Sequence, residues 1–271
     1  AVRAGQVAHS KTPQLPSSGP ECRLRILLVD NLRQEGSLGV LRLQCVAVDD
    51  DVNLALVPAP GSAFTPCTAS FRASLDLVSS FLRVQLLPEP TRHMALAWDI
   101  HIPGKPLKLL DGPSASAAMA LAALWLLQQQ FRDRSLHLPR ALAQLEPWML
   151  DRSGITAALS ADQSGRLSRV GGIGNKAEVL AGVANPERPA QLFAHPDDVK
   201  TLGAALPAGL QVHGVTSLRN LAECLAQALD MSTPQRLLAD AIQSAGTSAA
   251  GSMTRGSPLG TGSPTLQVAQ D

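Results

Sequence analysis

The stretch LLDGPSASAAMALAALWLL spans residues 109–127, and it raises the question of what a serine does at the start of a long apolar segment. Pro113 suits the first position of a helix, where its missing N–H is not needed, and Gly112 allows a sharp turn before it. The segment after Pro113 is apolar on all sides, although alanine, serine and the preceding Asp111 dilute it. We therefore expect a buried helix from residue 113 rather than a membrane span.

Ser114 falls in the first turn of that expected helix. There the unpaired backbone N–H groups and the positive end of the helix dipole favour negative charge, and a nucleophilic serine needs such groups to stabilise an oxyanion. The alternative is a serine that only caps a core helix after an Asp-Gly turn. Both interpretations stay open on this segment alone, because short motifs often match by chance.

The composition favours a soluble globular protein whose partners are peptides or proteins. Of the 271 residues, 45% are hydrophobic, and 23 basic against 22 acidic residues give a net charge of +1. This balance argues against a nucleic-acid groove and against an anionic membrane surface. The four cysteines form no C-x-x-C pair, so we expect no metal site, no disulfide framework and a reducing cytoplasmic location. We also expect no signal peptide and no membrane span.

The chain is expected to contain one domain between two flexible ends. The polar segment 1–22 and the Gly/Ser/Thr/Pro-rich segment 236–271 read as flexible, and 23–235 as a single folded domain. Apolar runs and helical spacing predict an α+β or α/β-like fold in which strands come first and helices dominate later. Strands are expected at 25–30, 40–48, 52–58, 94–102, 156–161 and 191–195, and helices at 70–83, from 113, from about 175, near 197–204 and at 217–230.

A serine nucleophile needs a base, and the six histidines show no triad signature. The segment RVGGIGNKAEVLAGVA (169–184) offers a lysine instead. Asn175 and Glu178 resemble a capping box, which places Lys176 in the first turn of a largely apolar helix. Burial and the positive helix end both favour the neutral amine. The alternative is an exposed lysine at a helix start, which is the commoner fate of lysine.

Taken together, these segments resemble the proteolytic domain of the Lon family of serine–lysine peptidases. The similarity lies in Gly-Pro-Ser-Ala opening a helix, a later strand and turn with Gly165 and Arg166, and Gly-Gly-Ile-x-x-Lys opening a second helix. The DIHIP segment (99–103), which includes His101, also resembles the strand of the family at that place. The resemblance implies the Lon proteolytic-domain fold, with Ser114 as nucleophile and Lys176 as general base of a serine endopeptidase.

Around the nucleophile, the resemblance assigns support of the turn and the oxyanion to Gly112, Pro113, Ala115 and Asp111. For Asp111, a simple turn or capping function is an open alternative. Ser116 stands where the family usually has glycine.

Around the lysine, the family threonine that helps to hold it aligns with Ala158. Thr156 and Ser160 share a strand face with Ala158, so either hydroxyl is a candidate substitute. The dyad separation of 62 residues (176 − 114) is longer than usual in the family, and the excess falls in the segment 131–153.

The resemblance also implies partners. Lon-type domains form rings, so the resemblance implies a homo-oligomer, with a ring of six subunits as its expected form, that acts on unfolded or delivered polypeptides. The chain has no GxxxxGK[ST] loop, so no cofactor is expected, and ATP would act only through a separate or removed AAA+ unfoldase module. The alternative function is a catalytically retired Lon-like domain that serves assembly or interaction.

Overall fold

The computed structural model describes residues 20–30, 35–48, 53–85, 93–131, 140–145, 153–184, 189–203 and 206–230. By its contacts the chain divides into two units, Ala1–Leu229 and Asp230–Asp271. The second unit is described only at Asp230, so the predicted tail 236–271 lies outside the described residues, as do residues 1–19. The first strand begins at Glu21, so the last two residues of the predicted flexible segment 1–22 belong to the fold.

Seven strands form one mixed sheet, and two short strands form a separate ribbon. The sheet strands are β1 (Glu21–Asp30), β2 (Glu35–Ala47), β3 (Asn53–Pro58), β4 (Met94–His101), β5 (Ser153–Thr156), β8 (Ala190–Ala194) and β9 (Leu210–Gly214), and the ribbon strands are β6 (Ala158–Leu159) and β7 (Leu167–Ser168). Their order is β3-β4-β2-β1-β5-β8-β9. β2 pairs antiparallel with β1 and β4, and all other neighbours in the sheet run parallel.

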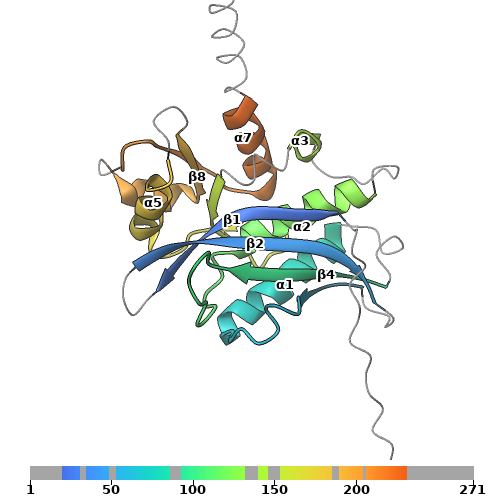
Figure 1. Ribbon diagram of the computed structural model, residues 1–271. Coiled ribbons are helices and arrows are strands. Elements are labelled where there is room, and N and C mark those ends of the chain that lie inside the picture. The colour runs from blue at the N-terminus through green and yellow to red at the C-terminus, as the bar shows by residue number, and fades with distance from the viewer. Residues whose placement is uncertain are drawn as a thin grey trace, which may run out of the picture. The chain divides into compact units, whose positions relative to one another are not determined.

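The helices complete a mixed α and β architecture, as the sequence predicted. They are α1 (Ala69–Gln85), α2 (Ser116–Gln130), α3 (Arg140–Ala143), α5 (Ile173–Ala181), α6 (Pro196–Leu202) and α7 (Leu218–Asp230). In Figure 1, α1 and α2 lie behind β1, β2 and β4, and α5 lies toward the other end of the sheet, next to β8. None of the described helices is both long enough and apolar enough to cross a membrane.

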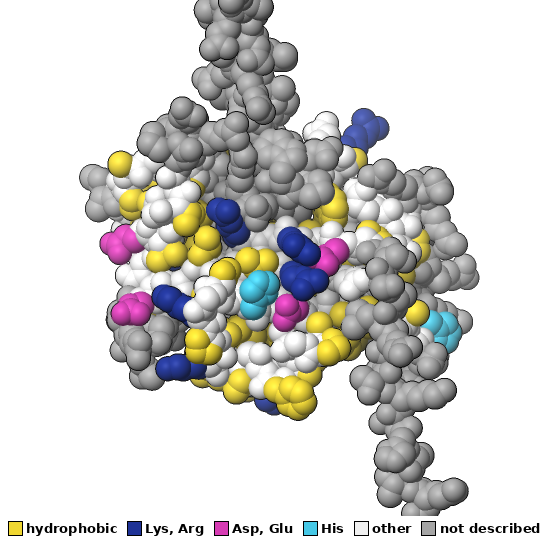
Figure 2. All heavy atoms as spheres, in the orientation of Figure 1, with side chains coloured by type: hydrophobic (Ala, Val, Ile, Leu, Met, Phe, Trp, Pro, Cys, Tyr) yellow, Lys and Arg dark blue, Asp and Glu magenta, His cyan; other side chains and the backbone are white. Residues whose placement is uncertain are grey.

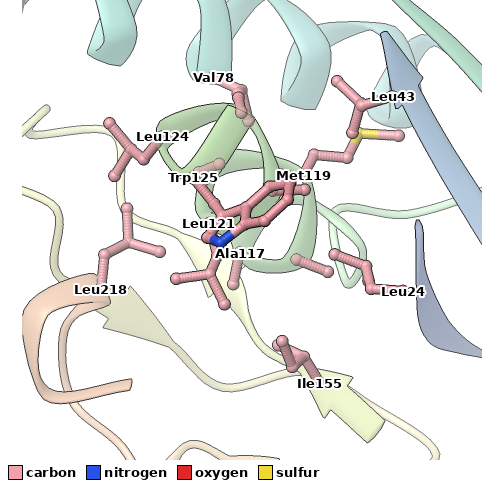
Figure 3. Packing of buried hydrophobic residues seen from close by; sticks show 14 of the residues in the cluster. Leu24, Leu43, Val78, Ala117, Met119, Leu121, Leu124, Trp125, Ile155 and Leu218 are labelled. Atoms are coloured by element: carbon pink, nitrogen blue, oxygen red, sulfur yellow. The ribbon is translucent and has the colours of Figure 1, made fainter. Parts of the chain in front are cut away.

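The centre of the main core is α2, which is buried on all sides. Every residue from Ser116 to Leu127 is buried, and the helix packs against α1, β1 and β2. Figure 3 shows residues of α2 among side chains from the sheet and from neighbouring helices. The Trp125 indole N–H donates to the Leu145 carbonyl at 2.9 Å, which satisfies its polar atom inside the core. An all-round apolar helix needs such cover, because every face must leave water.

A second, smaller cluster lies on the opposite face of the sheet. Along β1, Leu24 and Ile26 belong to the main core, whereas Leu27 belongs to the second cluster, as the two-residue period of a strand requires. The second cluster also contains the buried side of α5 together with residues of β8 and α6. Helices therefore cover both faces of the sheet, and α5 covers only part of its face.

Two expectations need correction, and one strand was missed. α2 begins at Ser116, not at residue 113, because the Ser116 N–H closes a tight turn onto the Pro113 carbonyl at 2.9 Å. The predicted strand 156–161 is split, because β5 ends at Thr156 and the chain then leaves the sheet to form β6. The strand β9 was not predicted, since its sequence LQVHG is short and polar.

Gly36 in β2 sets how closely α5 approaches the sheet. A Cβ on Gly36 would lie 2.5 Å from the Asn175 carbonyl oxygen and 2.5 Å from Val179 Cγ2. We predict that Gly36→Ala lowers the free energy of unfolding by about 1–3 kcal/mol, because the backbone atom moves only if α5 moves. The control is Gly171→Ala, which meets nothing within 4 Å. Equal stability of the two variants in chemical denaturation would contradict this role of Gly36.

Candidate active site

The turn that carries Ser114 is held by the residue two places after it. Ser116 Oγ donates to the Pro113 carbonyl at 2.7 Å and accepts the Leu159 N–H at 2.8 Å. Ser116 is fully buried, so these bonds are shielded from water. In addition, the Ala117 N–H donates to the Ala157 carbonyl at 3.3 Å. The start of α2 is therefore bound to the segment 157–159 by two hydrogen bonds.

Asp111 holds the other side of the turn. Its Oδ1 accepts the Gly112 N–H at 2.8 Å and the Thr68 hydroxyl at 2.7 Å. Thr68 Oγ1 also accepts the Phe71 N–H at 3.2 Å, so Thr68 caps the N-terminus of α1. Gly112 has φ +73°, which only glycine adopts without strain. The sequence pointed to Asp111 and Gly112 but not to Thr68, whose only signal was its place before a helical pattern.

Ser114 itself lies in the turn before α2 and not in the first turn of the helix. Its side chain is half-buried, and among the described residues its hydroxyl makes no hydrogen bond. Within the same part of the chain, the backbone N–H groups of Ser114 and Ala115 also have no acceptor. Free amides at the N-terminus of a helix are suited to bind an oxyanion. The N–H donors that the sequence analysis expected for an oxyanion are therefore still present near Ser114, although α2 starts later.

Lys176 lies on the buried side of α5. The buried residues of this helix are Ile173, Lys176, Ala177 and Leu180, which is the spacing of a core-facing stripe. The helix begins after Gly172, which has φ +69° and offers no side-chain cap. The predicted capping box at Asn175 is therefore wrong as a helix start, because α5 begins two residues earlier. Lys176 remains in the early part of the helix, and only 2% of its surface is exposed.

The partner of the buried amine is Thr156, the last residue of β5. Lys176 Nζ donates to Thr156 Oγ1 at 2.8 Å, and Thr156 is fully buried. Gly154 lies on the same strand face two residues earlier and meets Leu180, since a Cβ on it would lie 2.6 Å from Leu180 Cδ2. The strand and the helix therefore align Thr156 with Lys176, one helical turn before Leu180.

The surroundings of Lys176 lower its pKa from the ordinary 10.5 to about 8. The main cause is burial, which disfavours the charged ammonium. The Asp198 carboxylate acts in the opposite direction and raises the pKa. A substantial share of this amine is thus neutral in mildly alkaline solution, as a general base requires.

Ser160, the other candidate hydroxyl, lies beyond the ribbon strand β6. Its backbone N–H donates to the Arg166 carbonyl at 2.9 Å, and no hydrogen bond joins it to Lys176 among the residues that the structure describes. Ala158 pairs with Ser168 in the ribbon. The geometry thus brings Thr156, and neither Ala158 nor Ser160, to the lysine.

The segment 156–159 connects the two halves of the site. Thr156 contacts the lysine, while Ala157 and Leu159 bind the start of α2 two or three residues after Ser114. In the part of the chain that is described, no direct hydrogen bond joins Ser114 Oγ to Lys176 Nζ. Such bonds are often long in enzymes without substrate.

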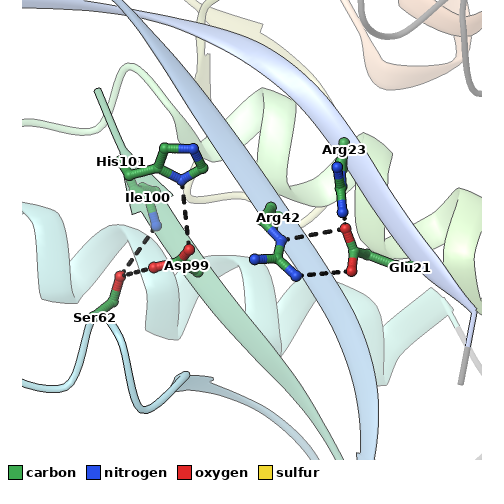
Figure 4. Close-up of polar contacts among 7 residues, drawn as sticks. All are labelled: Glu21, Arg23, Arg42, Ser62, Asp99, Ile100 and His101. Carbon is green, nitrogen blue, oxygen red and sulfur yellow. Dashed lines mark hydrogen bonds and ion pairs between the residues drawn. The ribbon is translucent and has the colours of Figure 1, made fainter. Parts of the chain in front are cut away.

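His101 belongs to a separate polar cluster on the open face of the sheet (Figure 4). His101 Nδ1 lies 3.5 Å from Asp99 Oδ2, and Asp99 Oδ1 accepts the Ser62 hydroxyl at 2.5 Å. Arg42 and Arg23 share Glu21 beside them. Figure 2 shows basic, acidic and histidine side chains gathered over the middle of that face. A hollow of about 240 Å³ lined by Glu21, Arg42 and Asp99 lies here and not at Ser114.

The strand register separates His101 from the lysine site. His101 pairs with Val40, Val40 with Arg25, and Arg25 with Gly154. His101 is therefore three strands, or about 14 Å, from Gly154, which lies two residues before Thr156 in β5. We conclude that His101 does not act directly on Lys176.

Several other expectations concern parts of the chain that are only partly described. Of the segment 131–153, to which the long dyad separation is assigned, the structure describes only residues 131, 140–145 and 153. The described residues contain no group of three or more His, Cys, Asp or Glu side chains suited to a metal ion. The four cysteines are free, and two of them are buried.

Comparison with known proteins gives no family assignment. No protein-family model matches the chain, and no curated protein matches it.

Ser116 and Ser114 are expected to differ in what they contribute to stability. Ser116→Ala removes a buried hydroxyl with two partners and leaves the Leu159 N–H without its acceptor, so we predict a loss of about 1–3 kcal/mol in the free energy of unfolding. Ser114→Ala removes a half-buried hydroxyl without a partner and should change stability by less than about 0.5 kcal/mol. Urea denaturation of both variants measures this, and an equal loss would refute the anchoring by Ser116.

Lys176 is expected to destabilise the fold at neutral pH. The unfolded chain holds the lysine proton up to the ordinary pKa of 10.5, whereas the folded chain releases it near 8. The stability of the wild-type protein therefore rises with pH between 8 and 10.5, and below pH 8 the full penalty applies. We predict that Lys176→Met raises the free energy of unfolding at pH 7 by on the order of 1–3 kcal/mol. This gain should shrink by pH 10.5, and a gain independent of pH would contradict the buried charge.

Proposed function

We propose that this protein is a serine endopeptidase with a Ser114–Lys176 dyad, in a domain related to the Lon proteolytic fold. The observation that carries the proposal is the almost complete burial of Lys176 on an apolar helix face, with a hydroxyl partner and a pKa lowered to about 8. A lysine is seldom buried in a core unless it is paired or functional. Among the described residues, the one hydrogen bond of its amine is to a neutral threonine, so a structural ion pair does not explain its burial.

In the proposed mechanism, the neutral amine of Lys176 removes the proton of the Ser114 hydroxyl while Oγ attacks a peptide carbonyl. The free N–H groups of Ser114 and Ala115 stabilise the oxyanion, and Lys176 then gives the proton to the leaving amine. Water, activated by the same lysine, hydrolyses the acyl-enzyme. Thr156 holds the amine throughout, and Asp111 with Gly112 and Pro113 keeps the turn open toward the substrate.

Polypeptides are the proposed substrates, and a ring of subunits the proposed assembly. Neither rests on geometry in a single chain; both follow from the resemblance to Lon-type domains. Without a nucleotide loop, the chain would act on unfolded or delivered chains, and an AAA+ unfoldase would have to come from elsewhere.

Two observations favour a second candidate, a retired domain that serves assembly. Ser114 Oγ and Lys176 Nζ share no hydrogen bond among the described residues, and Ser116 fills a position that is usually glycine in Lon-type domains. The two candidates differ in whether Ser114 reacts with an electrophile.

A fluorophosphonate probe tests the nucleophile directly. We predict that the wild-type protein is labelled at Ser114, with a rate that rises through pH 8 as Lys176 loses its proton. Ser114→Ala should remove labelling, and Lys176→Met should slow it by 100-fold or more, roughly the typical contribution of a general base. Peptide mapping by mass spectrometry locates the label, and hydrolysis of unfolded casein gives the activity.

Thr156 and Ser160, the two candidates for the role of the family threonine, give a matched pair of variants. Thr156→Val keeps the shape but removes the acceptor for Lys176, so labelling should slow by about 10-fold or more. Ser160→Ala should leave it unchanged. An unlabelled wild-type protein that folds and assembles would support the retired domain instead.

A further inference from the structure

Asp198, in the first turn of α6, is the most deeply buried acidic side chain among the described residues. Only 1% of its surface is exposed. Its Oδ2 accepts the Val170 N–H at 2.7 Å, and Oδ1 lies 3.9 Å from the Nε of Arg169, whose own side chain is 69% exposed. A buried carboxylate is costly unless it is well paired. Among the described residues, its carboxylate contacts one hydrogen-bond donor and one distant, solvated arginine.

The position of Asp198 connects it to the lysine. Arg169 and Val170 form the segment that leads through two glycines into α5, and α5 packs against α6. By binding the Val170 N–H, Asp198 fixes the start of the helix that carries Lys176. Its field also reaches Lys176 and opposes the effect of burial on that amine. No motif in the sequence pointed to this residue.

We propose that Asp198 is a positioning residue for Lys176: its carboxylate holds the segment that leads into α5 and presents a fixed negative charge to the lysine. A role of Asp198 in catalysis rests on the proposed function, in which Lys176 is the general base. Without this charge, the buried amine would lose its proton at lower pH. A lower pKa gives more neutral amine at neutral pH but makes that amine a weaker proton acceptor. The carboxylate therefore sets a balance between the neutral fraction of Lys176 and its basicity.

Other charged groups on the elements around α5 are poorly placed to replace Asp198. Glu178 on α5, Glu35 on β2, and Asp197 and Lys200 on α6 are exposed, and so is Arg169 before α5. Arg25 on β1 and His213 on β9 are half-buried. Among the described residues, Asp198 is the charged group that shifts the pKa of Lys176, in addition to the effect of burial.

The test separates charge from anchoring with two variants of the full chain. Asp198→Asn keeps an oxygen for the Val170 N–H but removes the charge, so the pH at which Lys176 loses its proton should fall by about one unit. Asp198→Ala removes both the charge and the acceptor for the Val170 N–H. It should therefore lower the pH at which Lys176 loses its proton by the same amount, and it should also reduce the maximal labelling rate at Ser114 by 10-fold or more. Asp197→Asn is the control, because it removes an exposed carboxylate from the same helix, and it should change neither property.

The readout is the titration of Lys176 itself, followed by NMR on protein with 13C at lysine Cε. The chain has five lysines, and Lys176→Met identifies the signal of the buried one. This measurement does not need catalysis. If the wild-type protein is not labelled at Ser114 but Asp198→Asn still shifts the titration, the proposed function fails while the link between Asp198 and Lys176 stands.

An unchanged titration in folded Asp198→Asn, or a shift to higher pH, would overturn the inference. Should that variant fail to unfold cooperatively, Arg169→Gln replaces it. Arg169 is exposed and partly neutralises Asp198, so its loss should move the titration of Lys176 upward by a few tenths of a unit. No upward movement would then count against the inference.

Discussion

The hydrogen bond from Lys176 Nζ to Thr156 Oγ1 crosses the contact between α5 and the sheet inside an apolar layer. An ammonium in this place lacks the water that stabilises its charge, and a hydroxyl replaces only part of it. The fold therefore keeps a group that it would hold more stably as an apolar residue. The proposed function gives the neutral amine a use that would offset this cost.

The close approach of helix and sheet determines where the amine lies. Gly36 on β2 and Gly154 on β5 let the backbones come so near to α5 that an added methyl group on either would overlap its atoms. A lysine side chain is long and flexible, with several rotatable bonds to restrict. Close packing on both sides of it limits those rotations. Two glycines, on strands that are separated only by β1, thus let α5 approach the sheet closely at the place where Lys176 lies.

The sequence predicted those features that have a local signal. The apolar runs marked most strands and the helices α1, α2, α5 and α7, whereas the apolar pattern around Lys176 left both a buried and an exposed lysine open. Helix starts were missed by two or three residues, because a tight turn before Ser116 and the left-handed Gly172 replaced the side-chain caps that were expected. Thr68 and Asp198 were missed for another reason. Their importance arises from partners 43 and 28 residues away, and no local pattern encodes such a pairing.

The threonine shows how structure can decide between alternatives that a sequence leaves open. Thr156 and Ser160 share a strand face in an extended segment, so the period of two could not separate them. The chain leaves the sheet after Thr156, however, and Ala157 to Leu159 turn toward the start of α2. This short segment binds the lysine at its first residue and the serine-bearing turn at the next ones. Because both halves of the site are attached to the same four residues, a shift of α2 or α5 alone is resisted by bonds to that segment. The separation of Ser114 and Lys176 is therefore set by local backbone geometry, even though Ser114 lies in the turn before α2 and Lys176 in α5, and these two helices pack on opposite faces of the sheet.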